Sequence, residues 1–182
     1  MDDIPLPDIS SRFWRSLCGC VMQEGYIFSD TIEANIILGD WKPDQEKLRR
    51  AAYISNLDEF LQDLPRGLQT KIAGEGSGLS QGQKQRILIA RAIYRDPEIF
   101  FFDEATNALD SSNEKIIIDR LDSFYRGKTV IIVAHRLSTV KHADLIIVLE
   151  KGRLTEHGKH ADLISRRGTY FNLVSNQLEL GE

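Results

Sequence analysis

Apolar and polar positions alternate regularly from about residue 81 to residue 149. Short continuous apolar runs are separated there by segments whose apolar residues recur at helical spacing. The runs span 99–102, 129–134 and 145–149, and helices are predicted over 81–95, 112–125 and 137–142. This alternation is typical of buried parallel strands packed against helices. We therefore predict an α/β fold with a parallel sheet flanked by helices.

The rest of the chain has a less regular pattern. Proline and glycine interrupt residues 1–36, which predicts short strands and loops. Apolar positions between residues 44 and 64 follow a period near 3.6, which predicts one or two amphipathic helices. After a turn at 150–153 we expect a polar strand around 154–156 and helical structure from 160 to 178.

Length and composition fit one soluble globular domain, because 182 residues, 42% of them hydrophobic, can bury one substantial core. The net charge of -4 gives nucleic acid and anionic membranes no overall attraction. All apolar runs are far shorter than the roughly 20 residues of a membrane-spanning helix, so we expect no direct membrane insertion. The closely spaced Cys18 and Cys20 suit neither a structural disulfide nor a zinc site, which favours a reduced, cytosolic pair.

A candidate anion site begins at Ser80, directly after a glycine-rich loop. Ser80 and Gln83 have the spacing of a capping box, in which each side chain bonds the other residue's backbone amide. The free N–H groups at a helix start carry about half a positive charge and can receive a phosphate. An isolated serine cap is usually only structural, so the case for a site depends on the neighbouring motifs.

Polar side chains that could assist hydrolysis follow two of the predicted strands. Asp103 and Glu104 end the run 99–102, and His135 ends the run 129–134. The carboxyl ends of parallel strands meet at one sheet edge, where α/β folds place their ligands. One carboxylate there can serve a nucleotide-bound Mg2+ while the other acts on a water molecule. We expect these three residues to lie at the same edge.

Together these segments resemble the nucleotide-binding domain of ATP-binding cassette (ABC) transporters. The signature motif LSGGQ is similar to the run of Leu79, Ser80, Gln81, Gly82 and Gln83. Residues 99–104 resemble the Walker B strand and 107–110 the D-loop. Residues 134–138 resemble the switch-histidine loop, and Gln23 resembles the Q-loop glutamine. The stretch 156–170 resembles exporter-type cassettes, particularly those of peptide and bacteriocin exporters.

The resemblance implies a partial P-loop NTPase fold, with a helical signature subdomain at about 37–95. Residues 1–36 and 96–182 would form the RecA-like α/β part. It further implies ATP and Mg2+ as cofactors. Asp103 would position Mg2+ through water, and Gln23 would join the metal to the transmembrane coupling surface. Glu104 would polarise the attacking water, and His135 would contact the γ-phosphate.

Two partners follow from the same resemblance. A second nucleotide-binding domain would pack head to tail, so that the helix at Ser80 contacts a γ-phosphate bound by the partner and Asp110 supports the partner's site. The transmembrane domain of an exporter would dock on an apolar surface formed by Tyr26, Ile27, Phe28 and Ile32, and the alternative for each of these residues is a place in the core. The expected location is the cytoplasm or the cytoplasmic face of a membrane, and the expected role is to power the export of a peptide or other substrate.

The sequence departs from the family pattern in two places. Gln81 replaces the third residue of the signature motif, which is glycine in the family. The Walker A pattern G-x-x-x-x-G-K-[ST] is missing, which implies that the chain starts downstream of that loop. The one Gly-Lys-Thr run, 127–129, has Asp122 where the first glycine belongs and follows a predicted helix instead of a strand. We therefore expect very slow or no ATP hydrolysis by the isolated chain, together with an exposed sheet edge or apolar face that favours self-association.

Two alternative functions share these motifs. A soluble ABC ATPase of DNA repair or translation would have the same signature and Walker B segments without a membrane partner. A non-catalytic module would instead modulate a complete cassette protein. The exporter-like segment 135–177 favours transport over the soluble ATPase, and co-purification with a complete cassette protein would support the non-catalytic module.

Overall fold

The computed structural model describes residues 4–103, 108–133 and 140–179. The chain divides into two compact units, Met1–Val133 and Ala134–Glu182. No helix in the described ranges is long and apolar enough to cross a membrane.

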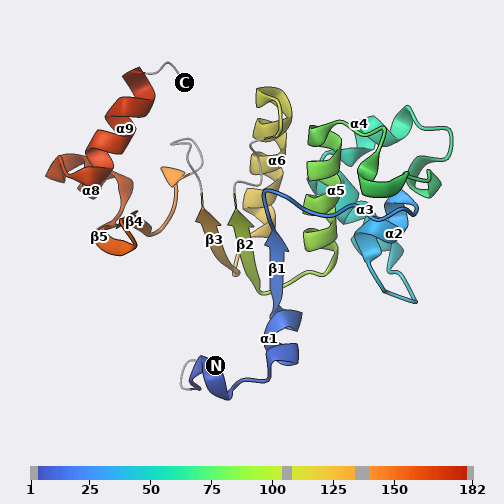
Figure 1. The fold of residues 1–182 in the computed structure, drawn as a ribbon, viewed down its shortest axis with the longest axis horizontal. Coiled ribbons are helices and arrows are strands. Elements are labelled where there is room, and N and C mark those ends of the chain that lie inside the picture. The colour runs from blue at the N-terminus through green and yellow to red at the C-terminus, as the bar shows by residue number, and fades with distance from the viewer. Residues whose placement is uncertain (1–3, 104–107, 134–139, 180–182) are drawn as a thin grey trace. The chain divides into compact units, whose positions relative to one another are not determined.

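The first unit contains a parallel three-stranded sheet (Figure 1). Its strands are β1 (Cys18–Val21), β2 (Ile99–Asp103) and β3 (Thr129–Val133), in the order β1-β2-β3. Phe100 and Phe102 of the central strand are buried. The parallel pairing predicted for the runs at 99–102 and 129–134 is therefore confirmed.

Helices of this unit pack against the sheet or lie beyond β1 (Figure 1). They are α1 (Ser11–Leu17), α2 (Ile32–Ile37), α3 (Gln45–Ile54), α4 (Leu57–Gln62), α5 (Gln81–Tyr94) and α6 (Ser111–Phe124). Short 3-10 turns occur at Leu6–Asp8, Gly67–Gln69 and Gly74–Gly76. The predicted helices at 44–64, 81–95 and 112–125 are confirmed, the first of them as two helices.

The prediction of only strands and loops in residues 1–36 is wrong, because α1 and most of α2 lie there. These helices have 7 and 6 residues, too few for a period of 3.6 to show in the sequence. A cap starts α2: the Thr31 hydroxyl accepts a hydrogen bond from the Ala34 amide at 3.0 Å.

The core of the first unit is centred on α5, which lies between the sheet and the helices α2, α3 and α4 (Figure 1). Ile87 and Ile89 of α5 are completely buried. On the sheet, the Phe100 ring contacts the Phe124 ring of α6 edge to face, with centroids 5.3 Å apart. Burial of these aromatic and branched side chains supplies most of the driving force for this unit.

The second unit contains a hairpin and two helices. β4 (Ile146–Glu150) pairs antiparallel with β5 (Arg153–Gly158), followed by α8 (His160–Arg166) and α9 (Thr169–Glu179). Within this unit the run 145–149 pairs antiparallel with β5, because Lys151 and Gly152 both have positive φ and reverse the chain in a tight hairpin turn. Its predicted parallel pairing in the larger sheet stays a prediction. The polar strand and the helical tail are confirmed, the tail as two helices. The helix predicted over 137–142 falls mostly outside the described residues.

Candidate functional site

The start of α5 has the predicted capping box. The Ser80 hydroxyl accepts from the Gln83 amide at 3.1 Å, and the Gln83 side chain accepts from the Ser80 amide at 2.8 Å. The side chains of Ser80 and Gln81 are exposed, whereas Leu79 packs against the core. The helix therefore presents a fixed N-terminus, with its partial positive charge, at the protein surface.

Gly82 lies in the first turn of α5 against the segment 108–109. A Cβ atom at this position would be 3.2 Å from the Ala108 carbonyl oxygen and 3.8 Å from the Leu109 side chain. Glycine therefore permits a close backbone approach here, and buried Leu109 anchors the segment in the core. The run Leu79 to Gln83 is therefore fixed by the packing of Leu79 on the core and by the contact of Gly82 with residues 108–109.

Asp103 and Gln23 lie at the same edge of the sheet. Asp103 is the last residue of β2 and is in register with Val133, and Phe102 is in register with Val21 at the end of β1. Gln23 follows two residues later and is exposed. A carboxylate and an amide oxygen suit Mg2+, which takes few protein ligands and keeps several of its waters. The donor set therefore fits the metal that the sequence predicts.

The pKa of the Cys20 thiol on β1 is affected by the charge at this edge. Burial raises the pKa of Cys20, and the charge of Asp103 raises it further. Cys18 and Cys20 are both free, in agreement with the predicted reduced pair. The predicted catalytic residues Glu104 and His135 lie outside the described residues. The strands β2 and β3 pair in parallel up to Asp103 and Val133, and the shared edge of the residues that follow them stays a prediction.

Asp110 is the N-cap of α6. Its carboxylate accepts hydrogen bonds from the backbone amide of Asn113 at 3.0 Å and from the Asn113 side chain at 2.7 Å. These two bonds, the backbone one first, hold the pKa of Asp110 below its ordinary value. Asp110 is thus a fixed, ionised, exposed group two residues from Ala108.

Only two of the four residues predicted to form the docking surface are exposed. Ile27 and Ile32 are core residues, 1% and 0% exposed, so their prediction as surface residues is wrong. Tyr26 and Phe28 are 56% and 43% exposed, and their rings meet edge to face at 5.0 Å. The prediction failed for Ile27 because it is buried between its exposed neighbours Tyr26 and Phe28, and for Ile32 because it lies on the buried side of α2.

Two residues of the helical region hold the exposed aromatic pair in place. Arg91 of α5 donates to the carbonyl oxygens of Asn35 at 2.7 Å and Tyr26 at 2.9 Å. Buried Asn35 accepts from the Phe28 amide at 2.8 Å and donates to the Phe28 carbonyl at 3.0 Å. The backbone of residues 26–28 is therefore fixed by side chains from α5 and α2.

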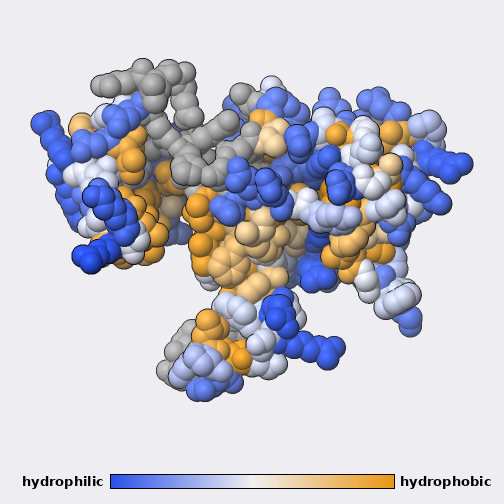
Figure 2. Space-filling view, viewed as in Figure 1, coloured by the Kyte–Doolittle hydropathy of each residue, from blue (hydrophilic) through white to orange (hydrophobic). Residues whose placement is uncertain are grey.

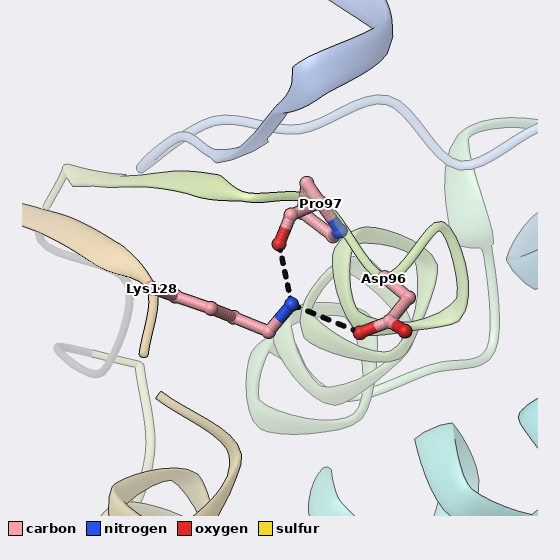
Figure 3. A network of polar contacts seen from close by, with 3 residues as sticks. All are labelled: Asp96, Pro97 and Lys128. Carbon is pink, nitrogen blue, oxygen red and sulfur yellow. Dashed lines mark hydrogen bonds and ion pairs between the residues drawn. The ribbon is translucent and has the colours of Figure 1, made fainter. Parts of the chain in front are cut away.

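The Gly-Lys-Thr run at 127–129 has a structural role (Figure 3). It lies between the end of α6 and the start of β3, the reverse of the strand-to-helix order that a phosphate loop needs. The Lys128 ammonium donates to the Pro97 carbonyl at 2.8 Å and pairs with Asp96 at 3.1 Å. The sequence argument against a phosphate loop here is confirmed.

A polar network around Asn113 was missing from the sequence predictions. It links Asp110 to Asn56, which precedes α4, and to Arg86 of α5. Asn56 has a left-handed backbone, and both Asn56 and Arg86 are buried. An arginine directly before the apolar stretch 87–90 was the available signal, since a buried charge requires partners.

Apolar side chains of β3 are exposed in the first unit. Ile131, Ile132 and Val133 are 46%, 37% and 53% exposed, and Figure 2 shows hydrophobic surface over the three-stranded sheet. Self-association through this surface stays a prediction.

Comparison with known proteins identifies the family. The family model described as ABC transporter matches residues 1–107. The chain is 41% identical to the ABC multidrug transporter MDR1 of Cryptococcus neoformans var. grubii and 43% identical to ABC transporter B family member 14 of Arabidopsis thaliana. Each alignment covers 97% of the present chain. A solved bacterial Atm1-family ABC exporter with ATP bound matches 97% of the chain with a TM-score of 0.92 and 37% identity.

The chain spans 13% and 14% of the two curated relatives and 31% of the solved exporter chain. Within that span the architecture agrees with a partial P-loop ABC ATPase fold. The parallel sheet with flanking helices and the order of the motifs support the same assignment. The chain therefore belongs to the ABC transporter family, as part of an exporter-type nucleotide-binding domain.

Proposed function

We propose that this chain supplies the signature and Walker B part of an ATP-hydrolysing domain that powers an ABC exporter. The observation that carries the proposal is the exposed, capped start of α5, held against residues 108–109. A helix N-terminus with a fixed serine hydroxyl and free amides suits the γ-phosphate of ATP. One relative is named an ABC multidrug transporter, and the family implies ATP binding, usually with Mg2+.

Each site residue has a proposed role. Asp103 holds Mg2+ through water and Gln23 provides a second oxygen at the same edge. When bound, the metal neutralises charge on the β- and γ-phosphates. Glu104 accepts a proton from the attacking water, and His135 donates a hydrogen bond to the γ-phosphate. Leu79, Gln81, Gly82 and Gln83 shape and orient the helix start beside Ser80.

The proposed partners are a second nucleotide-binding domain and an exporter's transmembrane domain. In a head-to-tail dimer, Ser80 faces the nucleotide that the partner binds, and Asp110 crosses to the partner's site. The exposed Tyr26 and Phe28 rings, fixed by Arg91 and Asn35, suit docking of the transmembrane domain at the cytoplasmic face. A peptide or a drug both agree with this proposal, because the transmembrane domain selects the substrate. The helical signature subdomain, about 37–95, and the RecA-like remainder act together in this assembly.

The test adds the 182-residue chain to a complete nucleotide-binding domain from a multidrug exporter. The signature serine of that complete domain is replaced, so that a homodimer of the complete domain hydrolyses ATP slowly. We expect the chain alone to release phosphate from ATP very slowly or not at all. We expect the mixture to release phosphate at least tenfold faster than either protein, because each contributes half of one site. A chain that binds the complete domain and lowers its turnover would be a modulating module instead.

Two variants of Ser80 separate phosphate contact from helix capping. Asn and Asp are both as good as Ser at an N-cap, and they differ from each other only in charge and one amide. We expect Ser80→Asn to retain most of the stimulation and Ser80→Asp to abolish it, because a carboxylate repels the γ-phosphate. Equal activity of the two variants would show that the start of α5 contacts no phosphate.

A further inference from the structure

The side-chain amide of Asn113 joins three parts of the chain that are distant in sequence. Its oxygen accepts hydrogen bonds from the Asn56 side chain at 2.7 Å and from Arg86 Nη1 at 3.4 Å. Its nitrogen donates to the Asp110 carboxylate at 2.7 Å. The chemistry of the two ends fixes this orientation, because a guanidinium only donates and a carboxylate only accepts.

Arg86 is the buried end of this network. It is 9% exposed, and Nη1 also donates to the Asn56 carbonyl at 2.9 Å. Its Nε has no hydrogen-bond partner among the described residues, so the Nη1 bonds carry most of its polar contact. Burial lowers the pKa of Arg86, and the charges of Glu59 and Asp110 oppose that shift. The cation on α5 and the anion at the start of α6 are thus electrostatically linked across Asn113.

A second contact joins the same two segments. The first turn of α5 approaches the Ala108 carbonyl and the Leu109 side chain closely at Gly82, four residues before Arg86. The start of α5 and the segment 108–110 are therefore held together at two points, one by backbone packing and one by the Asn113 amide. Both segments present exposed groups, Ser80 and Asp110.

We infer that Asn113 is a positioning residue that makes the start of α5 and the segment 108–110 a single rigid unit. The amide lies between a cation and an anion, with its oxygen toward Arg86 and its nitrogen toward Asp110. An apolar or charged side chain at this position could not interact favourably with both groups. This inference rests on the proposed function for its consequence: the unit presents Ser80 and Asp110 to a partner domain with a constant spacing.

The first test is amide hydrogen exchange on the intact 182-residue chain. We expect Asn113→Ala to speed the exchange of the amides of residues 84–86 in α5 and 113–115 in α6 by about fivefold, since hydrogen bonds to both are lost. The amides of β2 serve as an internal reference for global unfolding. Ser112→Ala, an exposed change in the same turn, is the matched control and should alter neither segment. Faster exchange in α6 alone would overturn the inference.

Asn113→Asp sharpens this test. An aspartate can still accept from Arg86 and Asn56 but repels Asp110, so we expect faster exchange at 113–115 with little change at 84–86. Equal changes in both segments would mean that a general loss of packing, not the polarity of the amide, is responsible, and would contradict the inference.

The second test measures phosphate release in the mixture with the complete nucleotide-binding domain. We expect Asn113→Ala to lower kcat about fivefold and to leave the KM for Mg-ATP unchanged, because the partner's phosphate loop sets the affinity. An unchanged kcat would overturn the positioning role even where the unaltered chain stimulates its partner. Failure of the unaltered chain to stimulate would overturn the proposed function instead, and the exchange experiment would still decide whether Asn113 couples the two segments.

Discussion

Replacement of Lys128 by methionine separates a structural lysine from a phosphate-binding one. The change keeps most of the apolar stem and removes the ammonium, which donates to the Pro97 carbonyl and pairs with Asp96 (Figure 3). The ammonium also lies 5.2 Å from the centre of the Phe124 ring. These contacts join the end of α6 and the start of β3 to the loop before β2. The expected loss is therefore one of stability in the first unit.

The magnitude follows from the burial of each contact. The Lys128 side chain is 13% exposed, so loss of its charged hydrogen bond costs about 1.5 to 3 kcal/mol. Asp96 is 39% exposed, so the ion pair adds less than about 1 kcal/mol. The ring contact adds about 0.5 to 1 kcal/mol, part of which a methionine stem on Phe124 recovers. A net loss of about 2 kcal/mol is the expected result, with the hydrogen bond to Pro97 as its largest part.

Native-state amide exchange of β2 measures this loss directly, because β2 is the central strand of the sheet. A destabilisation of about 2 kcal/mol speeds the exchange of the most protected amides by about 30-fold. Lys115→Met on the exposed side of α6 is the control and should change stability by less than about 0.5 kcal/mol. Unchanged β2 exchange in Lys128→Met, combined with loss of Mg-ATP binding by the mixed domains, would refute the structural role.

Three further predictions concern other parts of the chain. Gly168→Ala should destabilise the second unit by about 0.5 to 1.5 kcal/mol in the exchange of β4 amides, because its Cβ would displace the Glu156 carboxylate and break the hydrogen bond that this carboxylate accepts from the Tyr170 amide. Unchanged exchange would contradict the close approach. Arg91→Lys should make the bond after Tyr26 more susceptible to limited chymotrypsin digestion, since a lysine cannot donate to all the acceptors that the guanidinium reaches, and equal digestion of both proteins would argue against a fixed segment. The pKa of Asp110 is lowered in the folded chain, so its cap stabilises α6 fully above the ordinary carboxyl pKa and is lost as the pH falls through the folded pKa. First-turn amides of α6 should therefore lose protection below about pH 4. Asp110→Asn keeps the cap and should remove this pH dependence.

Several features were predictable because their causes are local. The capping box at Ser80 involves residues three apart, and both of its hydrogen bonds are present. The strands β2 and β3 are short apolar runs bounded by clear helices, so their pairing follows from the preference of such units for parallel sheets. The rejection of 127–129 as a phosphate loop also used only neighbouring elements.

Other features depend on contacts that no local pattern reveals. The apolar run of β4 resembles a buried parallel strand, but only one side of it is buried, with Val148 inside and Ile147 55% exposed. The turn at Lys151 and Gly152 decides the pairing, and the period of the run does not. The Asn113 network joins residues 27 and 57 positions apart, so its partners were not predictable from spacing.

Gln81 is the one departure within the signature segment, and the structure explains why the fold accepts it. Gln81 is the first residue of α5, its side chain is exposed, and the capping box uses Ser80 and Gln83 on either side of it. Gly82, the next residue, is the position where a Cβ would press on the Ala108 carbonyl, so glycine is needed at the second place of the pair and not at the first. In the proposed dimer, the effect of Gln81 is therefore expected where the start of α5 faces the partner's nucleotide, and not in the stability of the domain that carries it.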